Sequence, residues 1–156
     1  MNEQQVNYTL IEHILTLLKI LQMHHIEIDQ LMENHEDALL HSLPESQEIR
    51  TAYELMAFMD EMPGGFLIYY ADGDEQIIYA NKALLRIFGC DTLVEFRELT
   101  GNSFKGVVHP DDLADVEESV KKQIASNRYE LDYVEYRILR KDGEIRWIED
   151  YGHFIH

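Results

Sequence analysis

The sequence predicts an α+β domain that is preceded by an N-terminal helical, coiled-coil-like segment. All eight glycines lie at Gly64 or later, and the only helix breakers before that point are Pro44 and Pro63. Upstream of Pro63 the apolar residues recur at helical spacing, whereas short β-branched and aromatic runs alternate with turns downstream of it. We therefore expect residues 1–61 to form two helices and residues 62–156 to form the α+β domain.

The first expected helix, from about Tyr8 to His41, carries a heptad seam. Its members follow one another at alternating steps of four and three, and they are Leu10, Ile14, Leu17, Leu21, His24, Ile28, Leu31 and His35. Such a seam favours a homodimer through paired helices, and protonation of its two histidines near about pH 6 is expected to weaken the pair. Pro44 interrupts the pattern near residues 42–45, so a second helix is expected over about 45–61.

Two hairpins are expected, one at each end of the α+β domain. Residues 66–70 and 76–80 are rich in β-branched and aromatic side chains and are separated by turn residues. Residues 129–140 and 144–155 form a second, longer pair that is joined by an Asp-Gly turn. The chain order is therefore two strands, several helices and two strands.

Between the hairpins, short helices are expected over 81–88 and 93–99, because a glycine follows each run. A longer helix is expected from His109 to about Ser126, since a proline and two acids mark its first turn. Asn81 and His109 both stand where a helix begins. We expect them to act as structural caps.

Composition excludes several classes of partner. The chain has 30 Asp and Glu against 13 Lys and Arg, a formal net charge of −17, which repels phosphate backbones and anionic lipid. We therefore expect neither a nucleic-acid nor a membrane partner. The single cysteine cannot form an intramolecular disulfide, and no apolar stretch approaches the roughly 20 residues of a membrane span, so a cytoplasmic location is expected.

No catalytic constellation is evident in the sequence. Gly73-Asp74-Glu75 falls in a tight turn, and Gly64-Gly65 lacks the Lys-Ser/Thr that a phosphate-binding loop requires. The N-terminal histidines offer only two-ligand pairs such as His25 with Asp29, so no metal site is expected. The many carboxylates are scattered over turns and helix surfaces. We therefore expect no enzymatic activity from this chain.

The domain resembles the PAS sensory family, in the subtype whose long helix starts with His-Pro-Asp. The matching features are, in chain order, Pro63-Gly64-Gly65, Tyr79-Ala80-Asn81, Phe88-Gly89, His109-Pro110-Asp111-Asp112, residues 136–143 and Arg146-Trp147. The resemblance implies an antiparallel sheet that cups a small pocket, with helices on one face, and a role as sensor or dimerisation module. The preceding helices resemble the input region of bacterial proteins that carry a diguanylate cyclase (GGDEF) output domain.

The sequence departs from the family pattern after Ile155, where the family's fifth strand is expected. In the family that strand lies between the first and fourth strands, so its loss would leave two edges in the middle of the sheet. We therefore expect a C-terminally truncated domain. We then expect one of three arrangements: another copy supplies the missing strand, an N-terminal element covers the gap, or the sheet closes imperfectly.

Aromatic and aliphatic residues of the expected strands and helices are candidates for lining the pocket. They are Phe66, Ile68, Ile77, Tyr79, Phe88, Phe104, Val116, Tyr136 and Ile148. The sequence identifies no cofactor. Haem is not expected, because His109 is at a cap position. Covalent flavin is not expected, because Cys90 lies outside the reactive-cysteine motif of the flavin-binding relatives. Arg137 and Trp147 are expected to pack across the strands, with the guanidinium on the ring, and the alternative is a partner-binding hot spot at this pair.

Two functions follow from these expectations. The first is a cytoplasmic signal-transduction sensor that binds a small ligand or partner and controls an output domain, expected to be a diguanylate cyclase. The alternative is a purely structural homo-association module whose core is filled by its own aromatic residues. A bound small molecule distinguishes the first from the second.

Overall fold

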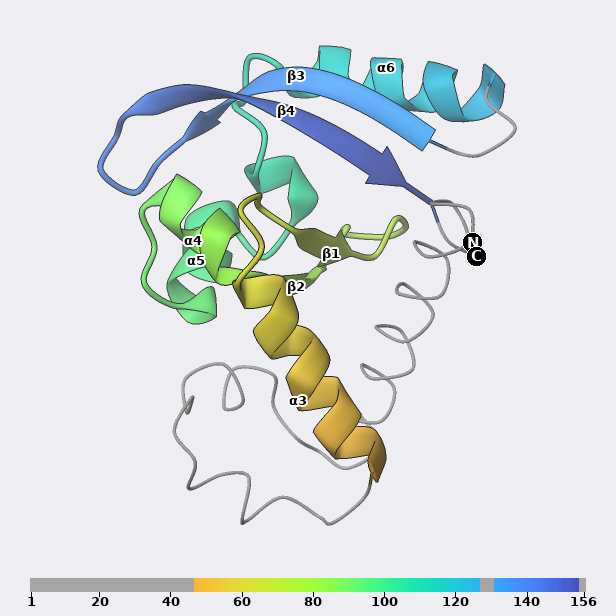
Figure 1. The fold of residues 1–156 in the computed structure, drawn as a ribbon. Coiled ribbons are helices and arrows are strands. Elements are labelled where there is room, and N and C mark those ends of the chain that lie inside the picture. The colour runs from red at the N-terminus through yellow and green to blue at the C-terminus, as the bar shows by residue number, and fades with distance from the viewer. Residues whose placement is uncertain (1–46, 127–130, 155–156) are drawn as a thin grey trace. The chain divides into compact units, whose positions relative to one another are not determined.

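The computed structural model describes residues 47–126 and 131–154 (Figure 1). The heptad seam, and with it the expected pH-sensitive helix pair, lies outside the described residues. The chain divides into two compact units, Met1–Gly64 with Asn81–Ala83, and Gly65–Ala80 with Leu84–His156.

The described part of the first unit contains helix α3, Gln47–Asp60, which lies where the second helix is expected. A buried amide closes the C-terminal end of this helix. The side-chain nitrogen of Asn81 donates to the carbonyl oxygens of Met59 at 2.8 Å and Gly64 at 3.0 Å. The Met59 carbonyl also accepts from the amide of Met62 at 3.2 Å, so Asn81 adds a second bond at the end of α3 and ties it to the segment that follows.

In the second unit, strands β1, Leu67–Tyr69, and β2, Ile77–Ala80, form the first expected hairpin. The register shifts between Ile68 and Tyr69, so the pairing contains a bulge. The outer edge of β2 is covered by the chain that follows α5. The amide of Ile77 donates to the carbonyl of Asn102 at 3.1 Å, which satisfies a backbone group that an edge strand leaves exposed.

Helices connect the two hairpins in the expected order (Figure 1). They are α4, Lys82–Phe88, α5, Leu93–Thr100, the short 3-10 helix η1, Phe104–Gly106, and α6, Leu113–Ser126. The short helix η1 was not expected from the sequence. Local side chains define the ends of α5, because the Thr92 hydroxyl accepts from the amide of Glu95 at 3.1 Å and Gly101 adopts a φ of 61°.

The start of α6 differs from the expectation. The helix begins at Leu113, and the preceding residues from His109 onward form a turn. The amide of Asp112 donates to the carbonyl of His109 at 2.9 Å, and the amide of Asp111 donates to Nδ1 of His109 at 3.2 Å. These short-range bonds hold a tight turn ahead of the first helical residue.

Strands β3, Leu131–Leu139, and β4, Ile145–His153, form the second hairpin. Among the described residues the two hairpins are separate two-stranded antiparallel sheets. Even-numbered β3 residues from Val134 to Ile138 are buried, whereas the odd-numbered ones are exposed or half-buried, so β3 and β4 have an inner and an outer face. The mixed α+β class that the sequence predicts is thus confirmed.

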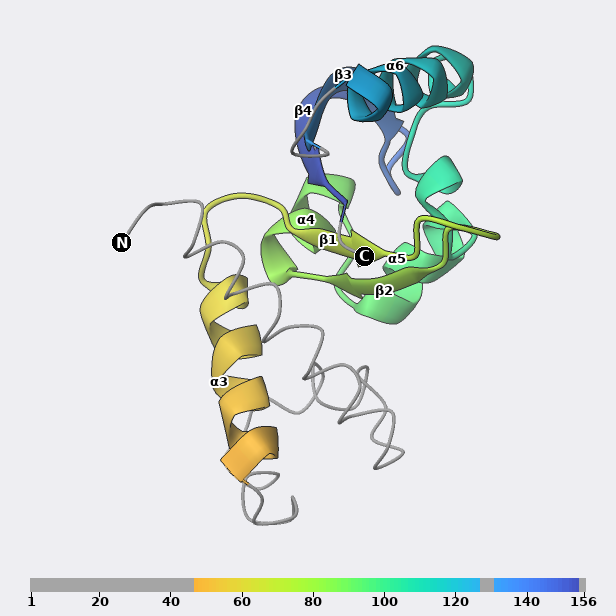
Figure 2. The ribbon, with the colours of Figure 1, turned by 90° about the vertical axis from the view of Figure 1, so that its right-hand side faces the viewer.

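Helix α6 runs beside β3 in both ribbon views (Figures 1 and 2). It covers the edge of β3 that faces away from β4. Gln123 binds the backbone of Tyr133, and the amide of His109, just before the helix, donates to the carbonyl of Arg137 at 2.7 Å. The edge of β3 is therefore closed to further strands.

The core of the second unit is built from both hairpins and the helices between them. Its most deeply buried side chains, each at most 1% exposed, include Ile77, Phe88, Phe96 and Ile138. The rings of Phe88 and Phe96 meet edge to face, with their centroids 5.0 Å apart.

Candidate functional site

Three aromatic rings from different elements meet at the inner face of β3. Tyr69 of β1 stacks on Phe104 of η1, with ring centroids 4.4 Å apart and an interplanar angle of 5°. Phe104 meets Tyr136 of β3 edge to face at 6.3 Å and 86°. We call these three residues the aromatic triad. They are distant in sequence, so the fold alone brings them together.

Carboxylates lie beside the aromatic triad on the same face of the hairpin. The hydroxyl of Tyr136 donates to Oδ2 of Asp150 at 2.7 Å, and the amide of Gly152 donates to Oδ1 of Asp132 at 3.2 Å. Neither carboxylate has a Lys or Arg within ion-pair distance in the part of the chain that the structure describes. The inner face of this hairpin therefore combines two acids with apolar rings.

Burial dominates the electrostatics of this cluster. It raises the pKa of Asp150, against the opposing effect of the Tyr136 hydrogen bond. It also raises the pKa of Asp132, with a further contribution from the charge of Asp150. Burial and the charge of Asp150 together raise the pKa of Tyr69 and of Tyr136. Both hydroxyls thus remain protonated, and hydrogen-bond donors, at neutral pH.

Glu75, in the turn between β1 and β2, is a third acid near this cluster. Burial raises the pKa of its carboxyl, and its charge contributes to the raised pKa of Tyr69. Its Oε2 atom is buried without a hydrogen-bond partner among the residues that are described. The acids and hydroxyls together suit a bound group that donates hydrogen bonds or carries positive charge.

The candidate pocket residues are distributed over several elements of the second unit. Phe104 and Tyr136 belong to the aromatic triad, and Phe88 packs on Phe96. Ile77, Tyr79 and Val116 are buried, on β2 and α6. The three remaining candidates, Phe66, Ile68 and Ile148, are half-buried.

Sequence reasoning missed Tyr69, Asp132 and Asp150 as site residues. One signal was available, because Asp132 and Tyr136 are separated by an even number of positions on one strand and therefore share a face. The position of Tyr69 depends on contacts between distant segments. No local pattern reports those contacts.

The two expected caps have different roles. The ring of His109 accepts a hydrogen bond in the turn before α6, as described above. Asn81 directly precedes α4, and its side-chain nitrogen donates to the carbonyl groups of Met59 and Gly64. The amide of Lys82, at the first position of α4, donates to Oδ1 of Asp60 at 3.0 Å. Asp60 therefore binds the first helical amide of α4, and the capping role expected of Asn81 stays a prediction.

Arg137 is the main basic residue of the outer face. It lies opposite Trp147 in the register of the hairpin, and its guanidinium carbon is 5.8 Å from the centroid of the indole ring, which confirms the expected packing. Its backbone amide and Nε both donate to Oδ2 of Asp112 at 2.9 Å, and Nη2 contacts Oδ1. This bidentate pairing with Asp112 was not foreseen.

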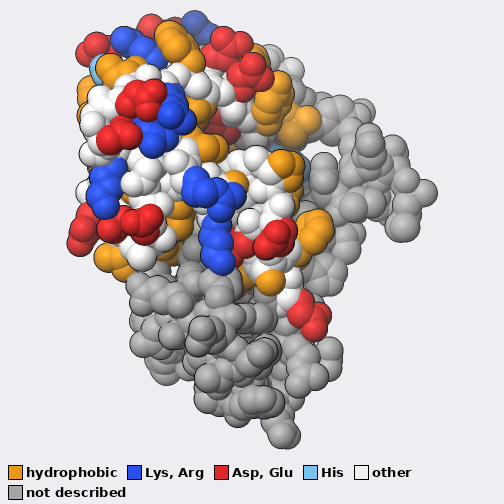
Figure 3. Space-filling model, turned by 60° about the vertical axis from the view of Figure 1, so that its left-hand side comes forward, with side chains coloured by type: hydrophobic (Ala, Val, Ile, Leu, Met, Phe, Trp, Pro, Cys, Tyr) orange, Lys and Arg blue, Asp and Glu red, His pale blue; other side chains and the backbone are white. Residues whose placement is uncertain are grey.

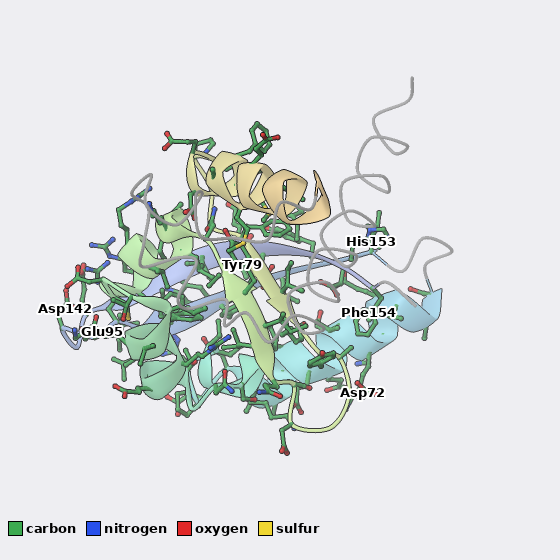
Figure 4. All side chains as sticks on the ribbon, turned by 90° about the horizontal axis from the view of Figure 1, so that it is seen from below. Asp72, Tyr79, Glu95, Asp142, His153 and Phe154 are labelled. Carbon is green, nitrogen blue, oxygen red and sulfur yellow. The ribbon has the colours of Figure 1, made fainter. Side chains whose placement is uncertain are left out.

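The turn of the β3–β4 hairpin is anchored to the junction between α4 and α5. Arg140 Nη1 donates to the carbonyl of Ile87 at 2.7 Å, and the amide of Lys141 donates to the carbonyl of Phe88 at 3.0 Å. Lys141 also pairs with Glu95 at 2.9 Å. Figure 4 shows Glu95 and Asp142 near one another at this end, and Figure 3 shows basic and acidic side chains side by side on one face.

Cys90 follows the same junction and is 4% exposed. Burial raises the pKa of its thiol. Because the thiolate is the reactive form, this environment suits a packing residue, as the sequence suggested.

The described residues contain no group of three or more His, Cys, Asp or Glu side chains that is arranged to hold a metal ion. No described helix has the length and apolar character needed to cross a membrane. The fold and the site thus define a small α+β domain in which an aromatic triad lies beside partly buried carboxylates.

Comparisons with known proteins give the family. The family model described as PAS fold matches residues 77–156, slightly more than half of the chain. This chain belongs to the PAS family, and its domain is a sensory or signalling module of a generally non-catalytic type. Neither the curated proteins nor the solved structures that were compared gave a match.

Proposed function

We propose that this chain is the sensor module of a cytoplasmic signal-transduction protein and that a small ligand or partner acts at the aromatic triad. The observation that supports this proposal is the partly buried Asp150 carboxylate, held by the Tyr136 hydroxyl and without a basic partner among the described residues. Burying such a group is costly unless its hydrogen bonds and charge are satisfied. A ligand group that donates hydrogen bonds to Asp150 would satisfy it.

The proposed mechanism is a shift between two packings of the β3–β4 hairpin. A ligand at the aromatic triad contacts β1, η1 and β3 together. It therefore favours the packing in which all three elements can contact it at the same time. The shift is limited by the difference in the ligand's affinity for the two packings.

The output and the assembly are part of the same proposal. The helices that the sequence predicts ahead of the domain resemble the input region of diguanylate cyclases, so we propose an output enzyme of that class. The heptad seam supports a homodimer through the N-terminal helices. The net charge of −17 argues against nucleic acid and anionic membranes as partners.

The family's fifth strand fits the outer edge of β4. The odd-numbered residues of β4 direct their backbone groups away from β3, and Trp147 and Glu149 have no backbone partner there among the described residues. The edges of β2 and β3 are covered, as described above. We therefore propose that a strand, from this chain or another copy, adds beside β4.

A second candidate function is structural association without a ligand. The near-parallel stacking of Tyr69 on Phe104 favours it, because the protein's own rings then occupy the space that a ligand would need. In this alternative, Asp132 and Asp150 have a structural role and contact no ligand.

Native mass spectrometry of the protein, purified without denaturation, tests the two functions. A stoichiometric small molecule that is lost in Asp150→Asn but kept in Asp142→Asn supports sensing. Asp142 is an exposed turn residue, so its variant controls for the loss of one negative charge. Protein without a bound molecule, and with unchanged stability after incubation with a cell extract of small molecules, supports structural association.

A further inference from the structure

Asp132 and Asp150 are diagonal neighbours on the inner face of the β3–β4 hairpin. In the register Asp132 lies opposite Gly152, and Asp150 lies opposite Val134, so the two carboxyl groups come from adjacent strands and share one face. Both side chains are partly buried. We call these two residues the aspartate pair. Like charges so placed repel each other, and the repulsion grows as water is excluded from the site.

Gly152 gives the carboxyl group of Asp132 its position. The Gly152 amide donates to Oδ1 of Asp132 at 3.2 Å. A Cβ atom at position 152 would overlap this carboxyl group, whose Cγ atom would be only 2.8 Å away. The carboxyl group of Asp132 therefore lies over β4, the strand that carries Asp150, and a side chain at position 152 would displace it.

Two phenols and a glutamate face the aspartate pair from the neighbouring elements. The Tyr136 hydroxyl, on β3, donates to Oδ2 of Asp150 at 2.7 Å. Burial raises the pKa of Tyr69, on β1, and the charges of both aspartates and of Glu75, in the β1–β2 turn, raise it further. None of these groups brings a positive charge to the pair.

The lysines near this site act on Glu75 and not on the aspartate pair. Burial raises the pKa of Glu75, Lys105 of η1 and Lys121 of α6 oppose this shift, and Glu117 of α6 adds to it. In the described part of the chain, no basic group lowers the pKa of either aspartate. His153 ends β4 at an odd-numbered position, on the other face of the hairpin from the pair. Among these residues, the pair is therefore neutralised only by taking up protons.

The hairpin is fixed at its turn, whereas the aspartate pair lies at its open end. The turn is held at the α4–α5 junction through Arg140 and Lys141, as described above. The pair lies near the start of β3 and the end of β4. On the same face, the aromatic triad joins β3 to η1 and β1 through ring contacts. Charged carboxylates favour contact with water and oppose this closure, whereas the rings favour it.

We propose that the aspartate pair is a proton switch that sets the packing of the β3–β4 hairpin on β1. With both carboxylates charged, the open end of the hairpin takes the more open and hydrated packing. When the pair takes up a proton, the repulsion is removed and the hairpin closes on the aromatic triad. This inference rests on the proposed sensor function and names the proton as the signal that acts at the same site.

The direction of the response follows from burial. Burial raises the pKa of Asp150 above about 3.9, the usual value in an unfolded chain, and burial with the charge of Asp150 does the same for Asp132. The closed packing buries the pair more deeply, so it binds protons more tightly than the open packing. The closed packing is therefore favoured as the pH falls through the raised pKa values. Because the two carboxylates repel, they titrate as a coupled pair.

Carbon-13 NMR of protein labelled at the aspartate carboxyl groups measures the protonation directly, from about pH 3 to about pH 8. Asp132→Asn and Asp150→Asn each remove one signal and thereby assign the pair. We expect both signals to titrate with midpoints above about 4. Asp150→Asn is expected to lower the midpoint of Asp132 by about one pH unit, because a neighbouring negative charge is lost.

Nuclear Overhauser effects between the rings of Phe104 and Tyr136 measure the packing in the same samples. Their intensity is expected to rise as the pH falls, with the midpoint of the carboxyl titration. Replacing both members of the aspartate pair with Asn is expected to keep the acidic-form intensity at every pH. The control, Asp115→Asn with Asp142→Asn, removes two charges from exposed positions and should keep the wild-type response. Circular dichroism confirms that all variants fold.

Three results would overturn the proposal. Midpoints near about 4 for both carboxyl groups would show that the site does not retain protons. Ring-to-ring intensities that stay constant while the carboxyl groups titrate would show that the packing does not respond. The same loss of response in the control variant would assign the effect to net charge.

The proposed small-molecule function is tested separately from the proton switch. A molecule that is bound in native mass spectrometry and lost in Asp150→Asn would support that function even where the packing is independent of pH. Failure of the switch and failure of the proposed function are therefore distinguished.

Discussion

The side-chain amide of Gln123 binds both backbone groups of Tyr133. Its Nε2 donates to the Tyr133 carbonyl at 2.8 Å, and its Oε1 accepts from the Tyr133 amide at 3.0 Å. The amide side chain thus takes the place of a neighbouring strand at the edge of β3. One residue on a helix thereby satisfies a donor and an acceptor that an edge strand would expose.

Gln123→Ala is expected to lower the free energy of unfolding by about 1–2 kcal/mol, since each lost hydrogen bond contributes about 1 kcal/mol. Urea unfolding measures the loss, and hydrogen exchange at the Tyr133 amide should accelerate. The neighbouring Lys122→Ala removes only an exposed ion pair with Glu118 and serves as control. Its effect should stay below about 0.5 kcal/mol. Equal effects of the two substitutions would contradict the prediction.

Asp112 gives the domain an acid-sensitive contact. Hydrogen bonds from the Arg137 side chain and backbone lower the pKa of Asp112 to about 2, from about 3.9 in an unfolded chain. The folded state therefore binds this proton more weakly than the unfolded state. The stabilisation is complete above about pH 4 and is lost as the pH falls towards about 2.

Asp112→Asn is expected to flatten the dependence of stability on pH over this acidic window. The variant is also less stable at neutral pH, because the charge-assisted bonds to Arg137 are weakened. Urea unfolding at several pH values between about 2 and 6 measures both effects. Equal slopes for the variant and the wild type would show that other carboxylates account for the acid sensitivity.

Tyr136→Phe removes the hydroxyl that donates to the partly buried carboxylate of Asp150. The expected loss of stability at neutral pH is about 1–3 kcal/mol, because an acceptor is left without a partner. Asp150→Asn in the same protein should reduce this loss, since a neutral amide is less costly to bury. A double-mutant cycle measures the coupling. Strictly additive effects would mean that the two groups do not interact in solution.

Acid should also reduce the effect of Tyr136→Phe. Burial raises the pKa of Asp150, so the folded state binds this proton more tightly than the unfolded state. The free energy of unfolding therefore rises as the pH falls through the raised pKa of Asp150, because protonation removes the cost of burying its charge. The difference in stability between Tyr136→Phe and the wild type should therefore become smaller as the pH falls. Thermal unfolding at several pH values measures this difference.

Gly106, the last residue of η1, approaches the preceding helix too closely for a side chain. A Cβ atom at this position would overlap the backbone carbonyl of Thr100, which cannot rotate away. Gly106→Ala is expected to cost about 3 kcal/mol or more. Gly64→Ala is the matched control, because a Cβ there has no neighbour within 4 Å. Thermal unfolding compares the two, and similar melting temperatures would contradict the prediction.

The fold was predictable from local signals to a large extent. Glycines and turn residues located both hairpins and the helices α4, α5 and α6, because backbone conformations with positive φ and tight turns restrict residue type. η1 was missed because Phe104-Lys105-Gly106 has no periodic pattern. The start of α6 was misplaced because a proline and two acids suit a turn as well as a first helical turn.

The site was much less predictable, because it depends on contacts between distant segments. Phe104 and Tyr136 were chosen as large apolar residues, but their partner Tyr69 was not. Asp150 reaches Tyr136 through the hairpin register, and registers are set by the whole sheet. A single sequence reports which residues are apolar, but it does not report which rings will meet.

The burial of Cys90 has a practical consequence for spectroscopy. Its thiol is 4% exposed, and burial raises its pKa, so maleimide reagents that require the thiolate should leave it unmodified in the native protein. A cysteine introduced on the surface would then be the sole labelling position. Fluorophores and spin probes can thus be attached one at a time without first replacing the natural cysteine.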